Sequence, residues 1–249
     1  MNIALSFVFN IFYVPWFVII SLVLAFFVTL AISFSYISGG HRHALRVFRF
    51  GIAWYARTLI KFFYPYVRVR CEYSEKSDAT EPYIFVSNHR SFVDSYLLAY
   101  LPYEGVLIVN TWPFRIPVLG YYAKLAGYLN INKMAPDVFF EKARRLLEEN
   151  VSLVFFPEGT RSIGRAMGKF HGTAFRLALQ SKMPLVPLCV TGTEKILPKG
   201  SLLIRPGKLT IRRLRAIPWE EYKDLTAFAL KNRIRRIIGE ELERMENPA

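Results

Sequence analysis

The sequence predicts an α/β protein, in which a single domain with a mixed sheet flanked by helices follows an N-terminal two-helix element associated with a membrane. The prediction rests on the alternation of short apolar runs with helical patterns after residue 82, and on an uncharged, apolar stretch before residue 41. We therefore expect a hydrophobic and basic amphipathic membrane element over residues 1–70 and an α/β domain over residues 71–249. A chain of 249 residues is long enough for both.

The apolar stretch at the start of the chain has the composition of a membrane segment. Residues 16–37 alone have the length of a helix that crosses the ~30 Å hydrocarbon layer of a bilayer. A cleaved signal peptide does not fit, because the stretch has no basic start and no small-residue cleavage site. Pro15 is expected to break the run into a short and a long helix. A plain anchor and a two-helix element that docks the rest of the chain on the bilayer both fit, and whether the segment spans the bilayer or lies in one leaflet stays open.

A basic, aromatic-rich stretch follows the apolar segment and suits the boundary between membrane and water. It contains Arg46, Arg49, Arg57, Lys61, Arg68 and Arg70 among Trp54, Tyr55, Phe62, Phe63, Tyr64 and Tyr66. Positive charge beside an apolar segment is typical of the cytoplasmic side, so everything after Arg42 is expected to be cytoplasmic.

The overall charge limits the classes of partner. The chain has 33 basic and 19 acidic residues, a net charge of +14, and such a surface attracts anionic lipid, phosphorylated substrates, acidic carrier proteins or nucleic acid. Because the basic residues are spread out and form no recognised nucleic-acid motif, nucleic acid is not an expected partner. Cys71 and Cys189 provide neither a disulfide framework nor the spacing of a metal site.

The remaining pattern predicts each element of the α/β domain in turn. After a polar loop at residues 72–82, apolar runs predict strands, and segments with an apolar side predict helices, as at 137–149. The strands are expected at 83–87, 105–109, 128–131, 151–156, 185–190 and 208–214. The helices are expected at 91–100, 116–125, 137–149, 171–180 and 222–245.

A polar run from Asn88 to Asp94 directly follows the first of these strands. If a helix starts near Ser91, Asp94 lies in its first turn and can reach back to His89. A carboxylate on one ring nitrogen fixes the tautomer of the imidazole and leaves the other nitrogen free to take a proton from a substrate hydroxyl. The alternative is that Ser91 and Asp94 form a capping box and that His89 is an ordinary loop histidine.

A second run, Phe156 to Ser162, closes the strand expected at 151–156. Gly159 permits close approach of a ligand to backbone N–H groups, and Arg161 carries a planar charged fork suited to phosphate. Glu158 is expected to orient a partner or the loop, and an internal ion pair between Glu158 and Arg161 is the alternative. Lys133, Arg165 and Lys169 are additional phosphate contacts or solvated surface charges.

Together the runs resemble the glycerolipid acyltransferase family, and the bacterial lysophosphatidic acid (1-acylglycerol-3-phosphate) acyltransferases in particular. The HX4D motif of the family, NHxSxxD, matches from Asn88 to Asp94, and FPEGTRS is complete from Phe156 to Ser162. A proline in an apolar strand matches at Pro187, and the segment from Gly127 to Lys133 is similar to a further motif, with lysine in place of arginine. The order and spacing agree over about residues 83–192.

This resemblance implies a membrane-bound enzyme of phospholipid biosynthesis that moves a fatty acyl chain from acyl-CoA or acyl carrier protein to the 2-hydroxyl of a lysophospholipid. His89 would be the base and Asp94 its partner. The glycerol phosphate would be held by Glu158, Gly159, Thr160, Arg161 and Lys133. No metal, cofactor or covalent enzyme intermediate is expected, and the expected location is the cell inner membrane.

Two departures leave the acceptor open. Many phosphatidate-forming members carry a lysine after the strand that follows the first motif, where this chain has Asn110, Thr111 and Trp112. Lys133 replaces an arginine. A lysophosphodiester or an amino-acid-headed lysolipid is therefore the alternative acceptor, and a non-catalytic lipid-binding membrane protein is the alternative from another functional class.

Overall fold

The computed structural model describes residues 3–62, 64–74, 82–116, 119–162, 164, 166–201 and 203–247. The chain forms two compact units. The first unit comprises Met1–Arg70, Ser91–Leu101 and Gly192–Leu209, and the second comprises Cys71–Arg90, Pro102–Thr191 and Thr210–Ala249.

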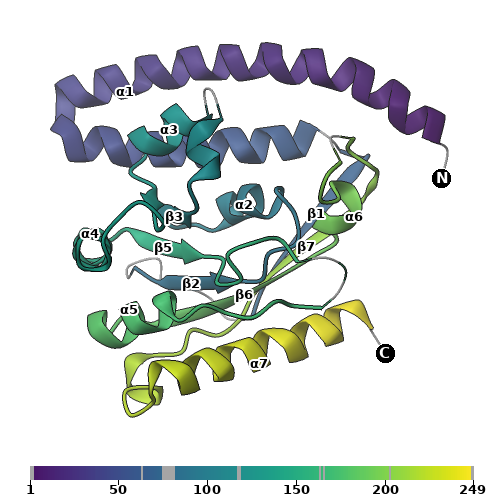
Figure 1. Cartoon of the computed structure of the whole chain (residues 1–249). Coiled ribbons are helices and arrows are strands. Elements are labelled where there is room, and N and C mark those ends of the chain that lie inside the picture. Colours follow the sequence, from purple (N-terminus) through teal and green to yellow (C-terminus); the bar gives the residue numbers. More distant parts are fainter. Residues whose placement is uncertain are drawn as a thin grey trace. The chain divides into compact units, whose positions relative to one another are not determined.

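One mixed sheet carries the strands in the order β1-β7-β6-β2-β5-β3-β4 (Figure 1). β2, β3, β4, β5 and β6 pair in parallel, and β7 pairs antiparallel with β6. The strands are β1 (Val67–Tyr73), β2 (Ile84–Ser87), β3 (Gly105–Val109), β4 (Leu129–Asn130), β5 (Ser152–Phe155), β6 (Leu185–Thr191) and β7 (Gly207–Arg213). β2 and β5 are buried along their whole length, which explains why they read as continuous apolar runs.

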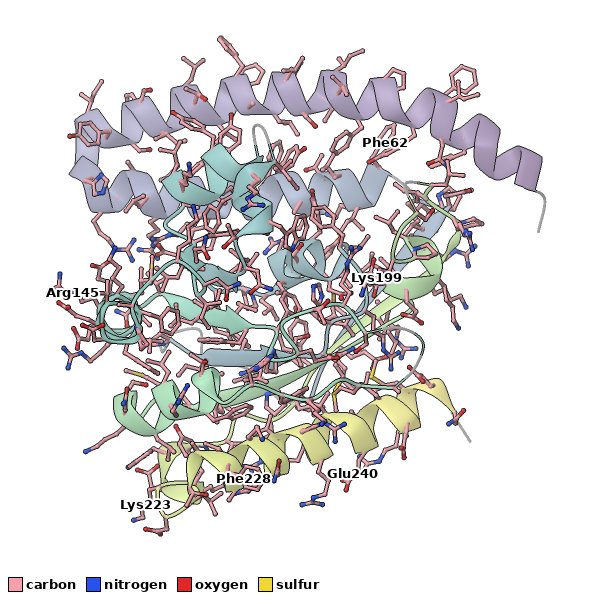
Figure 2. The ribbon with its side chains drawn as sticks, in the orientation of Figure 1. Phe62, Arg145, Lys199, Lys223, Phe228 and Glu240 are labelled. Carbon is pink, nitrogen blue, oxygen red and sulfur yellow. The ribbon has the colours of Figure 1, made fainter. Side chains whose placement is uncertain are left out.

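The core of the second unit lies between the sheet and its helices. α5 (Thr173–Ser181) and α7 (Ala227–Glu246) lie side by side against one face of the sheet (Figure 1), and α4 (Pro136–Glu148) packs on β5. Figure 2 shows Phe228 and Glu240 projecting from α7 away from the sheet, while the opposite side of α7, including Leu230, Ile234 and Ile238, is fully buried. Cys189 belongs to this core, and burial raises the pKa of its thiol, so it behaves as a small apolar side chain.

The short helices complete the list of elements. They are α2 (Asp94–Leu97), α3 (Leu119–Leu125), α6 (Thr193–Ile196), and the 3₁₀ turns η1 (Leu98–Tyr100), η2 (Trp112–Arg115) and η3 (Trp219–Glu221).

The first unit is built around α1 (Ile3–Phe62), which folds back on itself at Gly40. Gly40 has φ 74°, a left-handed conformation that favours glycine, and the two limbs of α1 run antiparallel on either side of it (Figure 1). Phe62 points toward the first limb (Figure 2) and stacks on Trp16 with ring centroids 3.9 Å apart. The hydroxyls of Ser21 and Tyr55 form a 2.7 Å hydrogen bond between the limbs.

Two polar side chains of α1 bind the shorter segments of the first unit. Asn10 is 5% exposed and exchanges two hydrogen bonds with the backbone of Ile204, at 2.9 and 3.0 Å. Arg57 donates to the carbonyls of Ala99, within η1, and of Leu101, directly after it. These bonds satisfy backbone groups that a short turn leaves unpaired, and they fix the segment that contains α2.

The predicted fold class is confirmed, because a single mixed sheet flanked by helices follows two long helical limbs, the first apolar and the second basic and aromatic-rich. The prediction that Pro15 breaks the apolar run is wrong, since α1 continues through Pro15 and turns at Gly40. β1 was not predicted, because its alternation of Val67, Arg68 and Val69 is a strand pattern that lies within the basic stretch.

Other boundaries differ by a few residues. The helix expected at 91–100 starts at Asp94 and tightens into η1, and the helix expected at 222–245 starts at Ala227. α6, η2 and η3 were not predicted. Most of the loop expected at 72–82 and the side chain of Arg165 lie outside the described residues.

Candidate active site

Four neighbouring parallel strands of the second unit end at one edge of the sheet. β2, β5, β3 and β4 are adjacent in that order, so the segments that follow them emerge together. His89 follows β2, Glu158 follows β5, Asn110 follows β3, and Asn132 and Lys133 follow β4. Both runs that the sequence singled out therefore reach the same edge, as their positions after two apolar strands predict.

Asn88 anchors the first run to the sheet. Its side-chain amide donates to the carbonyl of Val190 at 2.9 Å and accepts from the amide of Val190 at 2.8 Å. Asn88 is 1% exposed, so both groups would lack water if the bonds were lost. The pair of bonds fixes where the chain leaves β2 and thus where His89 begins.

The carboxylate of Glu158 joins the two runs. One oxygen accepts from the backbone N–H of His89 at 2.9 Å, and the other accepts from the backbone N–H of Gly168 at 2.7 Å and from the hydroxyl of Ser162. The backbone N–H of Ser162 donates in turn to the carbonyl of His89 at 2.8 Å. Glu158 is 5% exposed, so its charge is stabilised by these donors and not by bulk water.

The imidazole of His89 lies against Phe156, with ring centroids 4.2 Å apart and planes 26° apart. The backbone of His89 is held by Glu158 and Ser162, while its side chain is only half-buried. The neighbouring Arg90 is 2% exposed and forms an ion pair with Glu246 of α7. The loop thus presents the ring of His89 while its backbone is held on both sides.

Gly159 makes the tight turn beyond Glu158. It has φ 69°, a left-handed conformation that favours glycine, and a Cβ there would make a tight 3.2 Å contact with the ring of His171. The carbonyl of Gly159 accepts from the side-chain amide of Asn110 at 2.6 Å, and Asn110 accepts from the amide of Asn132 at 3.3 Å. This amide relay connects the ends of β3 and β4 to the loop after β5.

The remaining residues that were predicted to bind the substrate differ in how exposed they are. Thr160 and Lys133 are exposed and Arg161 is half-exposed, as contact with a soluble or lipid-borne ligand requires. Lys133 also lines a groove in the second unit.

Asp94 belongs to the first unit, where it opens α2. It is fully buried, and its carboxylate accepts from the backbone N–H of Ser91 at 2.7 Å. This is half of the capping box that the sequence allowed, while the hydroxyl of Ser91 donates to the carbonyl of Leu197. Because His89 belongs to the second unit, the pairing of the His89 and Asp94 side chains stays a prediction.

Three residues that hold the site were not predicted to do so, namely Ser162, Gly168 and Asn132. Ser162 lies four residues after Glu158 in a loop, and Gly168 lies ten residues after it, so no secondary-structure period links them. Asn110 could have been found by its place directly after a predicted strand, a position where site residues gather in parallel sheets.

The sequence is similar to those of known acyltransferases. The acyltransferase family profile matches residues 68–191. The chain is similar to a chloroplast 1-acyl-sn-glycerol-3-phosphate acyltransferase of Arabidopsis thaliana, 33% identical over 184 residues that cover 72% of this chain and 51% of the relative. It is also similar to 1-acyl-sn-glycerol-3-phosphate acyltransferase alpha of Ovis aries, 31% identical over 181 residues, or 71% of this chain and 63% of the relative. The chain spans about half the length of the first curated relatives that it matches.

The fold is similar to the crystal structure of the 1-acyl-sn-glycerophosphate acyltransferase PlsC from Thermotoga maritima. The TM-score is 0.81, with 98% of this chain and 99% of the other covered, at 20% sequence identity. The likeness extends over both compact units, and at this identity it concerns the fold.

Glu158→Gln tests the role of the carboxylate. The substituted amide replaces an acceptor oxygen with an N–H₂ group that faces other donors, so we expect the free energy of unfolding to fall by about 1–3 kcal/mol. Urea unfolding measures this. Glu148→Gln is the matched control, because the Glu148 side chain is 61% exposed on α4 and its loss should change stability little. Equal unfolding of the two variants would contradict the described network.

Proposed function

We propose that this chain, which belongs to the acyltransferase family through residues 68–191, moves a fatty acyl chain to the 2-hydroxyl of lysophosphatidic acid and so forms phosphatidic acid. The acyl donor is a thioester, either acyl-CoA or the acylated form of acyl carrier protein. The observation that supports this most is the junction of the two motif loops, where Glu158 binds the backbone of His89 at the carboxyl edge of the parallel strands. We take lysophosphatidic acid as the acceptor because the curated relatives are named 1-acyl-sn-glycerol-3-phosphate acyltransferases.

In the proposed reaction, a ring nitrogen of His89 takes the proton of the acceptor hydroxyl. The hydroxyl oxygen attacks the thioester carbonyl carbon, the ester bond forms, and the carbon–sulfur bond breaks. The thiolate leaves and recovers the proton from the imidazolium. Asp94 serves as the partner that stabilises the imidazolium, and backbone N–H groups near Gly159 stabilise the oxyanion. A thioester is already activated, so the reaction needs no metal, cofactor or covalent enzyme intermediate.

The residues of the second run then divide between two tasks. Arg161 and Thr160 contact the glycerol phosphate through their accessible side chains. Gly159, whose own N–H and carbonyl bind Phe156 and Asn110, leaves room for the phosphate to approach the loop. Glu158 acts through the loop that it orders, since its carboxylate is buried and occupied by donors of the protein itself. This keeps Glu158 in the site as a positioning residue.

His89→Ala and Asp94→Asn test the base. Loss of one positioned base lowers a rate by ~10²–10⁴-fold, and we expect kcat to fall in this range in each variant. The measurement is thiol release from an acyl thioester in the presence of lysophosphatidic acid. Circular dichroism and thermal unfolding serve as the control that the fold is intact. Undiminished thiol release by folded His89→Ala protein would remove the proposed mechanism.

A second acceptor class is favoured by the amide relay. Asn110 is neutral and its amide is bonded to Gly159, so it offers no positive charge to a phosphomonoester. A lysophosphodiester or an amino-acid-headed lysolipid therefore stays a candidate acceptor for the same chemistry.

A panel of acceptors distinguishes the two versions. The leading proposal predicts that kcat/KM is highest for lysophosphatidic acid and that Arg161→Ala raises the KM of this acceptor. The detection of products by mass spectrometry measures both. A higher kcat/KM for a diester or amino-acid-headed lysolipid would replace the acceptor while leaving the acyl transfer in place.

The proposed location is the cell inner membrane, with the α/β part in the cytoplasm. Support comes from α1, which is long and apolar enough over residues 9–62 to cross a membrane by length and composition. Large apolar side chains are exposed along its first limb, among them Phe12, Leu22, Phe26 and Phe34. The basic residues that follow favour the cytoplasmic side.

Protease added to right-side-out vesicles tests this orientation. We expect residues 71–249 to be protected from outside and cleaved only after the vesicles are opened. Cleavage of this part in sealed vesicles would place it on the opposite side of the membrane.

A further inference from the structure

One side of α7 contacts both loops that meet at the candidate active site. Arg235 and Glu246 are about three helical turns apart, so they project from the same side of α7, separated by ~16 Å along its axis. Gly239 lies between them on this side, where a Cβ would be 3.7 Å from the Cε of Met167. All of these residues belong to the second unit. This side of α7 is distinct from the apolar side that is buried in the core.

Arg235 holds the loop that follows Glu158. Its guanidinium donates to the carbonyl of Gly168 at 3.1 Å and to the carbonyl of Met167 at 3.0 Å. The donors of a guanidinium are fixed in one plane, which suits two adjacent acceptors. The carbonyl of Met167 and the N–H of Gly168 belong to one peptide group, and this N–H donates to the carboxylate of Glu158 at 2.7 Å. One peptide group therefore links the cation of Arg235 to the anion of Glu158.

The electrostatics of this link favour a fixed loop. A cation on the carbonyl oxygen polarises the peptide group and makes its N–H a stronger donor to the carboxylate on the other side. Gly168 also approaches Glu158 closely, because a Cβ at Gly168 would lie 2.8 Å from the carboxylate oxygen. Arg235 thus supports one of the bonds that Glu158 requires in its buried position.

Glu246 holds the other loop. It forms an ion pair with Arg90, which directly follows His89 in the chain. The side chains of Arg90 and Glu246 are only 2% and 15% exposed, so each charge depends on the other more than a surface pair would. The position of Arg90 is therefore tied to the last turn of α7.

The two contacts close a path of bonded groups. From Arg235 the path runs through Gly168 and Glu158 to the backbone N–H of His89. It returns through Arg90 to Glu246 on the same helix. A helix that binds both loops limits the movement of one loop relative to the other. Acyl transfer depends on such constancy, because a misplacement of ~1 Å can cost ~10²-fold in rate.

We propose that Arg235 and Glu246 are positioning residues for the acyl transfer, through which α7 fixes the loop of His89 relative to the loop of Glu158. The inference rests on the proposed function and gives α7, which lies beyond the residues matched by the family profile, a part in it. Neither residue touches the substrate. Arg235 acts through the peptide group between Met167 and Gly168, and Glu246 acts through Arg90.

Two single substitutions test the proposal separately. Arg235→Met removes the forked donor and keeps an unbranched stem, and Glu246→Gln removes the charge that faces Arg90. The matched controls are Arg236→Met and Glu243→Gln, which make the same changes of charge at exposed positions of α7. A further variant, Arg235→Lys, keeps the charge and loses the fork.

Steady-state kinetics of the whole protein in detergent micelles, with palmitoyl-CoA and lysophosphatidic acid, measures kcat and both KM values. The assay temperature is kept below the Tm of every variant, so that a fall in rate does not reflect unfolding. Hydrogen exchange of the backbone amides of His89 and Gly168 provides a measurement that does not depend on activity.

We expect kcat to fall about tenfold to a hundredfold in Arg235→Met and in Glu246→Gln, with both KM values unchanged, because the geometry of the reaction changes and the contacts with substrate do not. Arg235→Lys should recover part of the loss, and the two controls should equal the wild type. The amides of His89 and Gly168 should exchange faster in the two variants, while those of β6 stay protected.

A wild-type kcat in both folded variants would overturn the inference, as would an equal loss in the controls or a rise in KM alone. If the wild type transfers no acyl chain, the proposed function fails and hydrogen exchange decides the inference by itself. Faster exchange of the His89 and Gly168 amides in the two variants, and not in the controls, would then support the role of α7 in holding the loops. Unchanged exchange would refute it.

Discussion

The arrangement of the site depends on one buried carboxylate. Glu158 follows β5, yet it accepts hydrogen bonds from His89, which follows β2, and from Gly168, ten residues farther along the chain. Its charge is nearly removed from water, so it requires these donors, and the donors in turn fix two loops against each other. This carboxylate therefore holds the loop of His89 at a constant position relative to the loop that follows β5.

The sheet supplies the second constraint. Adjacent parallel strands end at one edge, and the site uses the ends of β2, β5, β3 and β4. Asn88 anchors the first loop to β6, and Asn110 and Asn132 connect the outer strands to Gly159. All four of these strands belong to the second unit, so one framework holds the loops in which we place the chemistry.

Much of this arrangement could be predicted from the sequence, because strands buried on both faces read as apolar runs and the polar loops begin where those runs end. β1 escaped notice since its Val–Arg alternation lies in a stretch that also suits a membrane surface. The turn of α1 is at Gly40, whose φ of 74° favours glycine, and not at Pro15, through which the helix continues. The bonds of Glu158 to Ser162 and Gly168, and the relay through Asn110, arise from tertiary contacts that no local pattern specifies.

Hydrogen exchange of the backbone amide of His89 tests most directly whether Glu158 holds this loop. The account predicts that this amide, bonded at 2.9 Å to a buried carboxylate, exchanges slowly in the wild type and fast in Glu158→Ala, while the amides of β2 stay protected in both. Exchange of the His89 amide at the rate of an unstructured peptide in the wild type would contradict it.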